Sequence, residues 1–406
     1  MKNTPEIRFK GFTDAWVQRR LGEVADIVRG ASPRPIQDPK WFDDNSDIGW
    51  LRISDVTEQN GRIYYLDQKI SEAGQSKTRV LTEPHLLLSI AATIGRPVIN
   101  YIKTGVHDGF LIFLNPKFEQ EFMFQWFEMF RLQWQQYGQP GSQVNLNSDL
   151  VKAQEILLPP SEEQTAIGNL FRTLDNTILL YKRKLDGLKQ LKKAYLQQMF
   201  PQEGETVPKV RFTGFKGDWE MRKLGEISTF RRGSFPQPYG NAEWYDEDNG
   251  MPFVQVVDVG NDLRLVDDTK QKISELAQHK SVYVPTGKVI VTLQGSIGRV
   301  AITQYPAFVD RTLLIFDDYK LSTDIYYWAY VVQQKFDIEK KTAPGGTIKT
   351  ITKEVLSEFE IALPVIDEQT AIGNFFRNLD DQIATQQAKL DNLKKLKSAF
   401  LQKMFV

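Results

Sequence analysis

Residues 163–169 read Glu-Gln-Thr-Ala-Ile-Gly-Asn, and residues 368–374 repeat these seven residues in the same order. Met199-Phe200 likewise returns as Met404-Phe405, so the two copies are related by a shift of 205 positions. Apolar residues follow each other in steps of three and four, interrupted by Lys192, at Phe171, Leu174, Ile178, Tyr181, Leu185, Leu188, Tyr195 and Met199. This spacing predicts a helix of about 37 residues, roughly 55 Å long, in each copy.

The ends of the first helix carry their own signals. Ser161 and Gln164 have the spacing of a capping box, and Pro201 follows the last apolar position. Two equally long helices, each with one apolar stripe, are most simply packed on each other as an antiparallel coiled-coil pair. The alternative is that each helix docks on its own half of the chain.

The segments before the helices repeat as well. Pro5–Phe12 matches Pro208–Phe215 at a shift of 203 positions, and Trp16, Asp55 and Arg96 have counterparts at the same shift. The second half has two extra residues, which we place in a loop between positions 333 and 346. Strands are predicted at 49–56 and 86–90 with duplicates at 253–259 and 288–293, and helices at 118–137 and 324–340. Each half is therefore expected to be a mixed α and β globule.

Composition bounds the function. The 406 residues contain no cysteine, which excludes disulfides, thiolate zinc sites and a cysteine nucleophile. The N-terminus is polar and no run of about 18 apolar residues occurs, so we expect no membrane span and a cytoplasmic protein. Lys plus Arg equals Asp plus Glu at 51 each. A neutral chain that binds DNA must segregate its basic residues or borrow positive charge from a partner.

Known catalytic patterns are missing from the sequence. No glycine run followed by Lys and Ser or Thr could cradle a phosphate. Residues 38–41 and 115–118 approach the Asp/Asn-Pro-Pro-aromatic loop of base methyltransferases, but both have Lys at the second Pro. His85, His107 and His279 show no ligand spacing. We predict neither a catalytic nor a metal site.

The repeated opening Pro-x-[Ile/Val]-Arg-Phe-x-Gly-Phe, and the repeated Leu-Pro, Glu-Gln and long helix ending Leu-Gln-x-Met-Phe, resemble the specificity (S) subunits of type I restriction-modification systems. The resemblance covers nearly the whole chain. It implies an α+β fold with two similar mixed α/β target-recognition domains in pseudo-twofold arrangement, separated by two long antiparallel coiled-coil helices. The implied boundaries are 1–157 and 207–362 for these domains, 158–206 for the first spacer helix with its linker, and 363–406 for the second spacer helix.

The resemblance also implies partners. Each domain would read one half of a bipartite site in double-stranded DNA, and the helices would set the spacing and dock two methyltransferase (M) subunits, around which restriction (R) subunits assemble. This chain would have no activity of its own and no cofactor. S-adenosylmethionine, ATP and Mg would belong to the partner subunits. From another class, the alternative is a protein-binding scaffold whose duplicated globules are spaced by the coiled coil.

Positions that differ inside a shared framework are candidates for reading bases. Arg34 aligns with Gln237 between two shared prolines, and Arg52 aligns with Gln255. Arginine suits guanine and glutamine suits adenine, although surface Arg and Gln also interchange without consequence.

Two turns complete the predicted DNA-binding set. The first pairs Ala91 and Thr93 with Gln294 and Ser296, and its shared Arg96 and Arg299 fit phosphate contact or a structural ion pair. The second lies just before the first helix and contains Gln143. That second tract either touches DNA or merely turns the chain.

Overall fold

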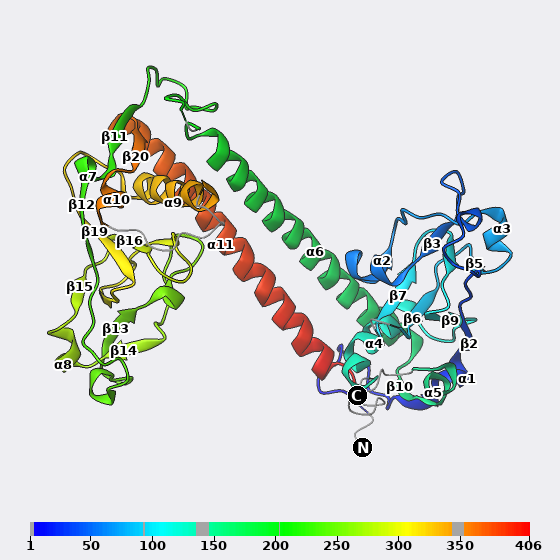
Figure 1. The fold of residues 1–406 in the computed structure, drawn as a ribbon. Helices are drawn as coiled ribbons and strands as arrows, with labels where there is room; N and C mark the ends of the chain where they lie inside the picture. Colours follow the sequence, from blue (N-terminus) through cyan, green and yellow to red (C-terminus); the bar gives the residue numbers. More distant parts are fainter. Residues whose placement is uncertain (1–3, 92–93, 135–145, 203, 343–352) are drawn as a thin grey trace. The chain divides into compact units, whose positions relative to one another are not determined.

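The computed structural model describes residues 4–91, 94–134, 146–202, 204–342 and 353–406 (Figure 1). The chain forms two compact units. Unit 1 comprises Met1–Lys182 with Ala388–Val406, and unit 2 comprises Arg183–Gln387. The division passes through both long helices, so each unit contains the beginning of one helix and the end of the other.

The described residues of unit 1 form three sheets. A five-stranded sheet has the order β2 (Asp26–Arg29), β9 (Phe110–Leu114), β6 (Leu86–Ser89), β7 (Pro97–Asn100) and β4 (Arg62–Ile63). A three-stranded sheet has the order β3 (Gly49–Leu51), β8 (Thr104–Val106) and β5 (Arg79–Leu81), and β1 (Val17–Arg20) pairs with β10 (Glu155–Leu158). All pairings are antiparallel except β3 with β8 and β4 with β7. The helical elements are α1 (Leu21–Val24), η1 (Pro39–Trp41), α2 (Ile53–Glu58), α3 (Glu72–Gln75), α4 (Gln120–Trp134), α5 (Ser148–Ala153) and the start of α6 (Ser161–Gln198).

Unit 2 repeats this order of elements. One four-stranded sheet has the order β12 (Ser228–Arg232), β19 (Leu313–Tyr319), β16 (Val289–Thr292) and β17 (Val300–Ile302). A second four-stranded sheet has the order β14 (Gln271–Ile273), β13 (Met251–Val254), β18 (Ala307–Val309) and β15 (Val282–Val284). In addition, β11 (Glu220–Lys223) pairs with β20 (Glu360–Leu363). The helical elements are α7 (Leu224–Ile227), η3 (Ala242–Trp244), η4 (Val256–Asp258), α8 (Glu275–Gln278), α9 (Ile325–Thr342), α10 (Lys353–Ser357) and α11 (Ile366–Lys403). The predicted mixed α and β globules are confirmed.

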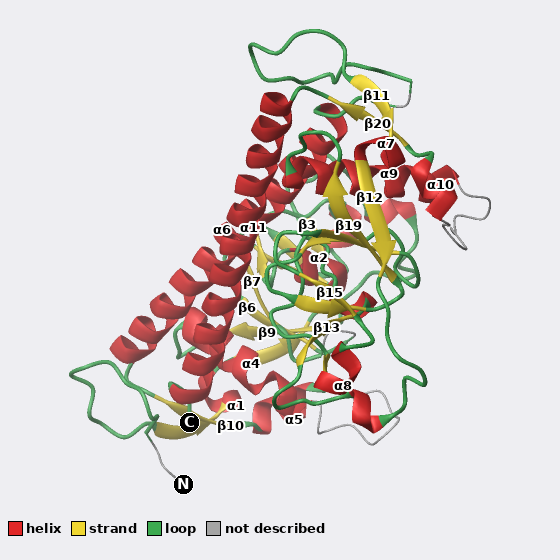
Figure 2. Ribbon diagram, turned by 90° about the vertical axis from the view of Figure 1, so that its left-hand side faces the viewer, coloured by secondary structure: helices red, strands yellow, loops and turns green. Residues whose placement is uncertain are grey.

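The helices α6 and α11 are uninterrupted, with 38 residues each (Figure 2). Within unit 1 the start of α6 runs antiparallel to the end of α11, and Lys397 Nζ lies 2.5 Å from Asp175 Oδ1. Within unit 2 the end of α6 runs antiparallel to the start of α11, and Lys192 Nζ lies 2.5 Å from Asp380 Oδ1. The predicted long helices and their antiparallel packing within each unit are confirmed.

Each helix ends in the core of the other copy's globule. Met199 and Phe200 are buried in unit 2, where Phe200 packs on Tyr327, whereas Met404 and Phe405 are buried in unit 1. The interpretation in which each helix docks only on its own half is therefore wrong. The physical reason for the observed arrangement is the burial of apolar side chains. Moving one Phe side chain out of water stabilises the folded protein by roughly 1.5–3 kcal/mol.

Two predicted strands end earlier than expected. The strand at 49–56 stops at Leu51, because the Asp55 carboxylate accepts the Arg52 N–H at 2.8 Å and starts α2. In unit 2, Asp258 accepts the Gln255 N–H at 2.8 Å and starts η4. The prediction that Arg52 and Gln255 lie within strands is wrong, since both residues occupy the N-cap of a helical turn.

The capping box predicted for Ser161 and Gln164 is also wrong. The Pro160 carbonyl, not the Ser161 side chain, accepts the N–H groups of Glu163 and Gln164, at 3.0 Å each. The Gln164 side chain makes other hydrogen bonds. It accepts the Glu119 N–H at 2.9 Å, just before α4, and donates to the Pro159 carbonyl at 2.9 Å. Gln369 repeats both bonds at the start of α11. The amide therefore ties the long helix to the aromatic helix of the same globule.

The neighbouring glutamate joins the repeated opening of each half to the long helix. The Arg8 guanidinium donates to both oxygens of Glu163, at 2.6 and 2.8 Å, and Trp16 Nε1 donates to the same carboxylate at 3.2 Å. In unit 2 Arg211 binds Glu368 in the same two-pronged way, at 2.7 and 2.8 Å. Both carboxylates are completely buried. The two most recognisable motifs of the sequence are therefore partners in space.

Removing this carboxylate tests its contribution. We expect Glu163→Gln to lower the free energy of unfolding by about 3 kcal/mol, because the Arg8 guanidinium, whose side chain is only 12% exposed, loses its counter-charge. The matched control Glu162→Gln changes an exposed neighbour and should stay within about 0.5 kcal/mol. Urea unfolding followed by tryptophan fluorescence measures both variants. Equal losses in the two variants would contradict the role given to Glu163.

Candidate nucleic-acid interface

In unit 1, three loops that are distant in sequence meet around the turn His107-Asp108-Gly109, which joins β8 to β9. The Asp108 carboxylate accepts a hydrogen bond from Arg34 Nη2, at 2.6 Å. A Cβ atom placed on Gly109 would lie 3.2 Å from Ile53 Cδ1 and 3.5 Å from Ala91 Cβ. The loop of Arg34, the start of α2 and the turn at Ala91 therefore converge on one place, which we call reading cluster 1.

Unit 2 has the equivalent arrangement around Asp310-Arg311-Thr312, between β18 and β19. The Tyr239 hydroxyl donates to the Asp310 carboxylate, and the Arg311 guanidinium lies over the Tyr239 ring, 5.3 Å from its centre. A Cβ atom on Gly295 would lie 3.5 Å from Val256 Cγ1, which places the turn 294–296 beside η4. We call these residues, with Gln237 and Gln255, reading cluster 2.

Each cluster borders a hollow. The hollow of unit 1 measures about 700 Å³, and its lining includes Arg52 and His107. The hollow of unit 2 measures about 380 Å³, and its lining includes Gln255 and Asp310. Arg52 corresponds to Gln255 and His107 to Asp310 at the shift of 203 positions. The two units therefore present different polar side chains at the same place in the fold.

The predicted site residues fall into two groups. Arg34, Gln237, Gln294 and Ser296 are exposed in the clusters, and Arg52 lies in cluster 1 with its guanidinium bonded to Asp55 at 3.0 Å. Arg96 and Arg299 are half-buried and bind the loops that follow α2 and η4, with Arg96 Nη2 3.0 Å from Asn60 Oδ1 and Arg299 Nη1 3.4 Å from the Val259 carbonyl. Thr93 and Gln143 lie outside the described residues. DNA contact by all of these residues stays a prediction.

Sequence reasoning missed the turn at the centre of each cluster. Asp108 aligns with Arg311 at the shift of 203 positions, directly beside matching buried strands. In unit 1 the guanidinium comes from the loop (Arg34) and the carboxylate from the turn. In unit 2 the turn supplies the guanidinium and the loop supplies the amide of Gln237. The exchange of Arg34 for Gln237 therefore accompanies a second exchange, and an arginine is relocated rather than lost.

Electrostatics fixes the protonation of cluster 1. Burial lowers the pKa of His107, and the charges of Arg34 and Arg29 lower it further against the opposing effect of Asp108. The neutral ring agrees with its hydrogen bond, since His107 Nδ1 accepts the Gly109 N–H at 2.9 Å. Burial works against the charge of Asp108, but the Ser32 hydroxyl and the nearby cations outweigh it and lower the pKa of that carboxyl.

Cluster 2 contains a protonated phenol. Burial and the hydrogen bond to Asp310 raise the pKa of Tyr239 to about 12. At neutral pH its hydroxyl is therefore a donor to Asp310. Its ring at the same time carries the Arg311 guanidinium. Tyr239 thus holds both polar groups of the turn in place.

The methyltransferase-like tetrapeptide 38–41 has a structural role. The Asp38 carboxylate accepts the Lys40 N–H at 3.1 Å and caps η1, while Trp41 is buried and donates to the Pro35 carbonyl at 2.9 Å. In the described part of the chain, no three His, Asp or Glu side chains are gathered as metal ligands. The same ranges contain no helix that is both long and apolar enough for a membrane span.

The structure is a duplicated α+β fold with one polar loop cluster in each unit. Comparison with known proteins supplies the family. The family model described as "Type I restriction modification DNA specificity domain" matches residues 13–190 and again residues 216–395. The chain belongs to this family, which is one of non-catalytic specificity proteins.

Individual specificity subunits are similar to part of this chain. The putative type I restriction enzyme MjaX specificity subunit of Methanocaldococcus jannaschii is 23% identical over 280 residues, which are 64% of this chain and 60% of that protein. The EcoR124I/EcoR124II specificity subunit of Escherichia coli is 26% identical over 174 residues, 41% of this chain and 42% of that protein. The chain thus spans about 60% of the length of the relative from M. jannaschii.

Solved structures share the fold. The crystal structure of a type I restriction-modification S subunit from M. genitalium has a TM-score of 0.64 and 13% identity, with 99% of both chains covered. A chain from a structure that addresses complex assembly and conformational transition of the type I R-M system has a TM-score of 0.53 and 21% identity, covering 98% of this chain and 99% of that chain.

Titration of His107 tests the geometry of cluster 1. We expect its pKa to lie below the ordinary 6.5, and Arg34→Gln to raise it because one neighbouring cation is removed. Since the folded value is the lower one, the stabilisation by the neutral ring is complete above the ordinary pKa. It is lost as the pH falls through the folded pKa. An NMR titration of the histidine ring protons measures this, and a His107 pKa at or above 6.5 would refute the arrangement.

Proposed function

We propose that this chain is the DNA sequence-specificity subunit of a type I restriction-modification complex, and that each unit reads one half of a bipartite site. The observation that carries the proposal is the pair of reading clusters. Equivalent loops on equivalent sheets present Arg34, Arg52 and Asp108 in one unit and Gln237, Gln255 and Arg311 in the other. A shared frame with different hydrogen-bonding groups is what two unlike half-sites require.

The energetics favour Arg34 as a base contact. Its ion pair with Asp108 is exposed, with 69% of the Arg34 side chain accessible. Such a pair contributes only about 0–1 kcal/mol, whereas a bidentate contact of arginine with guanine provides about 1–3 kcal/mol of discrimination. Arg34 can therefore exchange Asp108 for a base.

Arg52 is held more firmly, because its partner Asp55 is buried and also caps α2. The Arg52 guanidinium donates to Asp55 Oδ1 at 3.0 Å, and the backbone N–H of Arg52 donates to Asp55 Oδ2 at 2.8 Å. Arg52 is therefore the less available of the two arginines. It suits a contact that leaves its bond to Asp55 in place.

The proposal assigns the remaining functions to partners. Two methyltransferase subunits dock on the long helices and restriction subunits assemble around them, in the cytoplasm. S-adenosylmethionine, ATP and Mg are bound by those subunits. Because the chain has equal numbers of acidic and basic residues, the methyltransferase subunits also supply much of the phosphate neutralisation.

Selection from a randomised DNA library tests the proposal. With methyltransferase subunits present, methylated products should contain two short defined blocks, separated by an undefined gap of one length. A single uninterrupted motif, or methylation without sequence preference, would refute the reading of a bipartite site.

Two substitutions test the assignment of the clusters. Arg34→Ala should relax one base pair of one block, and Arg311→Ala should relax one base pair of the other, each by about 1–3 kcal/mol. The control Arg222→Ala removes an exposed arginine on β11, outside both clusters, and should leave both blocks intact. The same library selection reads out all three. If Arg34→Ala and Arg311→Ala affected the same block, the assignment of one cluster to each half-site would be wrong.

A further inference from the structure

One arginine in each unit connects the recognition sheet to a long helix. Arg62 follows Gly61, whose carbonyl accepts the Ile99 N–H at 2.8 Å. Arg264 follows Leu263, whose carbonyl accepts the Ile302 N–H at 2.9 Å. Ile99 and Ile302 correspond at the shift of 203 positions, so Arg62 and Arg264 occupy the same place in the two folds.

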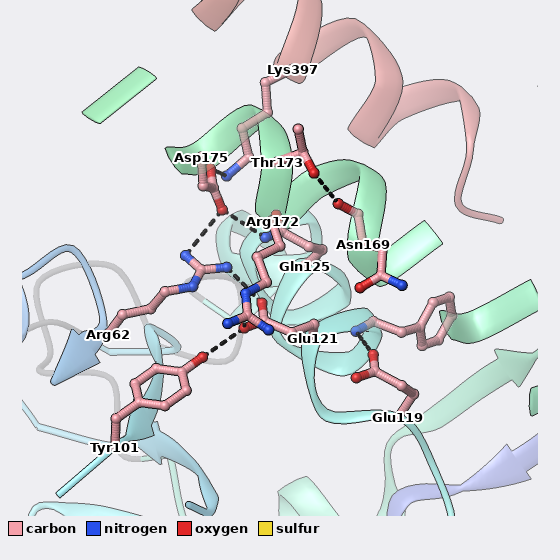
Figure 3. A network of polar contacts seen from close by, with 11 residues as sticks. Arg62, Tyr101, Glu119, Glu121, Gln125, Asn169, Arg172, Thr173, Asp175 and Lys397 are labelled. Carbon is pink, nitrogen blue, oxygen red and sulfur yellow. Dashed lines mark hydrogen bonds and ion pairs between the residues drawn. The ribbon is translucent and has the colours of Figure 1, made fainter. Parts of the chain in front are cut away.

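In unit 1 this arginine belongs to a buried network (Figure 3). Arg62 Nη2 lies 2.6 Å from Glu121 of α4, and Nη1 lies 3.0 Å from Asp175 of α6. The Asp175 carboxylate also accepts hydrogen bonds from Gln125 Nε2, at 2.8 Å, and from Lys397 Nζ of α11, at 2.5 Å. Arg62 of β4 is thereby joined directly to α4 and α6, and through Asp175 to α11.

The network contains two carboxylates and two largely buried cations, and the half-exposed Arg172 lies at its edge with Nε 4.0 Å from Glu121 Oε1. Two cations, Arg62 and Lys397, face the two carboxylates of Glu121 and Asp175. Burial works against the charge of Arg62, but the hydrogen bond and charge of Glu121, with Asp175, raise the pKa of the guanidinium. The Tyr101 hydroxyl donates to the remaining oxygen of Glu121 at 2.7 Å. The side chains of Arg62, Glu121 and Asp175 are only 6–8% exposed.

In unit 2 the equivalent arginine makes an exposed contact. Arg264 Nη2 lies 2.7 Å from Asp381 of α11, and both side chains are about half exposed, at 50% and 49%. The neighbouring Asp380 is the counterpart of Asp175 and accepts Lys192 and the Tyr330 hydroxyl instead. An exposed pair contributes little and is screened by salt, whereas breaking a buried pair is strongly destabilising.

We propose that Arg62 is a positioning residue, which fixes the recognition sheet of unit 1 on the long helices and thereby restricts the complex to one gap length between the half-sites. Arg264 holds the sheet of unit 2 less tightly. The inference rests on the proposed function. It assigns gap discrimination to a network that lies in the helices and β4, separate from the residues that face the bases.

The test measures methylation by the complex with methyltransferase subunits, on DNA that carries the selected half-sites at the native gap and at gaps one or two base pairs longer or shorter. In Arg62→Met with Glu121→Gln, which removes one charge of each sign and keeps the pair of Asp175 with Lys397, the preference for the native gap should fall about tenfold. The matched variant Arg264→Met should change it less than about threefold. Base preferences in both blocks should stay as in the wild type.

A conservative variant covers the case in which the double variant does not fold. Arg62→Lys keeps the charge but cannot bridge two carboxylates with a planar fork, so it should give an intermediate loss of gap preference. A folded Arg62 variant with the wild-type gap preference would overturn the inference, and so would an equal loss in Arg264→Met or altered base preferences. A wild-type complex without any gap preference would instead overturn the proposed function.

Discussion

The buried ion pair of Arg8 with Glu163, repeated as Arg211 with Glu368, is the interaction on which the arrangement of each unit depends. A carboxylate with no access to water is stable only if its hydrogen-bonding capacity is met, and here an arginine fork meets it from the opening segment of the same repeat. The next residue, Gln164 or Gln369, binds the chain just before the aromatic helix. One dipeptide therefore fixes the start of the long helix relative to the globule.

The other end of each long helix imposes a second constraint. Phe200 packs on Trp219 and Phe376 in unit 2, and Phe405 packs on Trp16 and Phe171 in unit 1. Each core thus requires a residue from the other copy of the repeat. Asp380 lies 205 positions after Asp175, and Lys397 lies 205 positions after Lys192. The ion pairs Lys192–Asp380 and Lys397–Asp175 therefore join equivalent positions of α6 and α11. Duplication of the sequence consequently produces two recognition units on one shared pair of helices.

The sequence predicts the parts that depend on local periodicity. Long helices follow from apolar steps of three and four, and β6 and β16 follow from short apolar runs. The prediction from sequence fails where a hydrogen bond with one polar side chain determines the backbone conformation. Asp55 and Asp258 start helical turns inside segments that are otherwise typical of strands, and a propensity argument does not register a single capping bond.

The candidate site is predicted only in part, for a different reason. Arg34 and Gln237 are conspicuous because prolines flank both. Asp108 reaches Arg34, and Arg311 reaches Tyr239 in the loop of Gln237, only through the pairing of distant strands. The equivalence of Arg62 and Arg264 is harder to recognise in the sequence, because the two residues are 202 positions apart, whereas the surrounding residues of the repeat are 203 positions apart. Strand pairing reveals it, whereas an ungapped self-alignment places Leu265 opposite Arg62.

The most direct test of the account is to shorten both α6 and α11 by one turn, about 5.4 Å, and to select the methylated target again. If the shared helices set the distance between two half-site readers, the gap should change by roughly one or two base pairs, at about 3.4 Å per step, with both blocks unchanged. An unchanged gap in a folded, active complex would contradict the account.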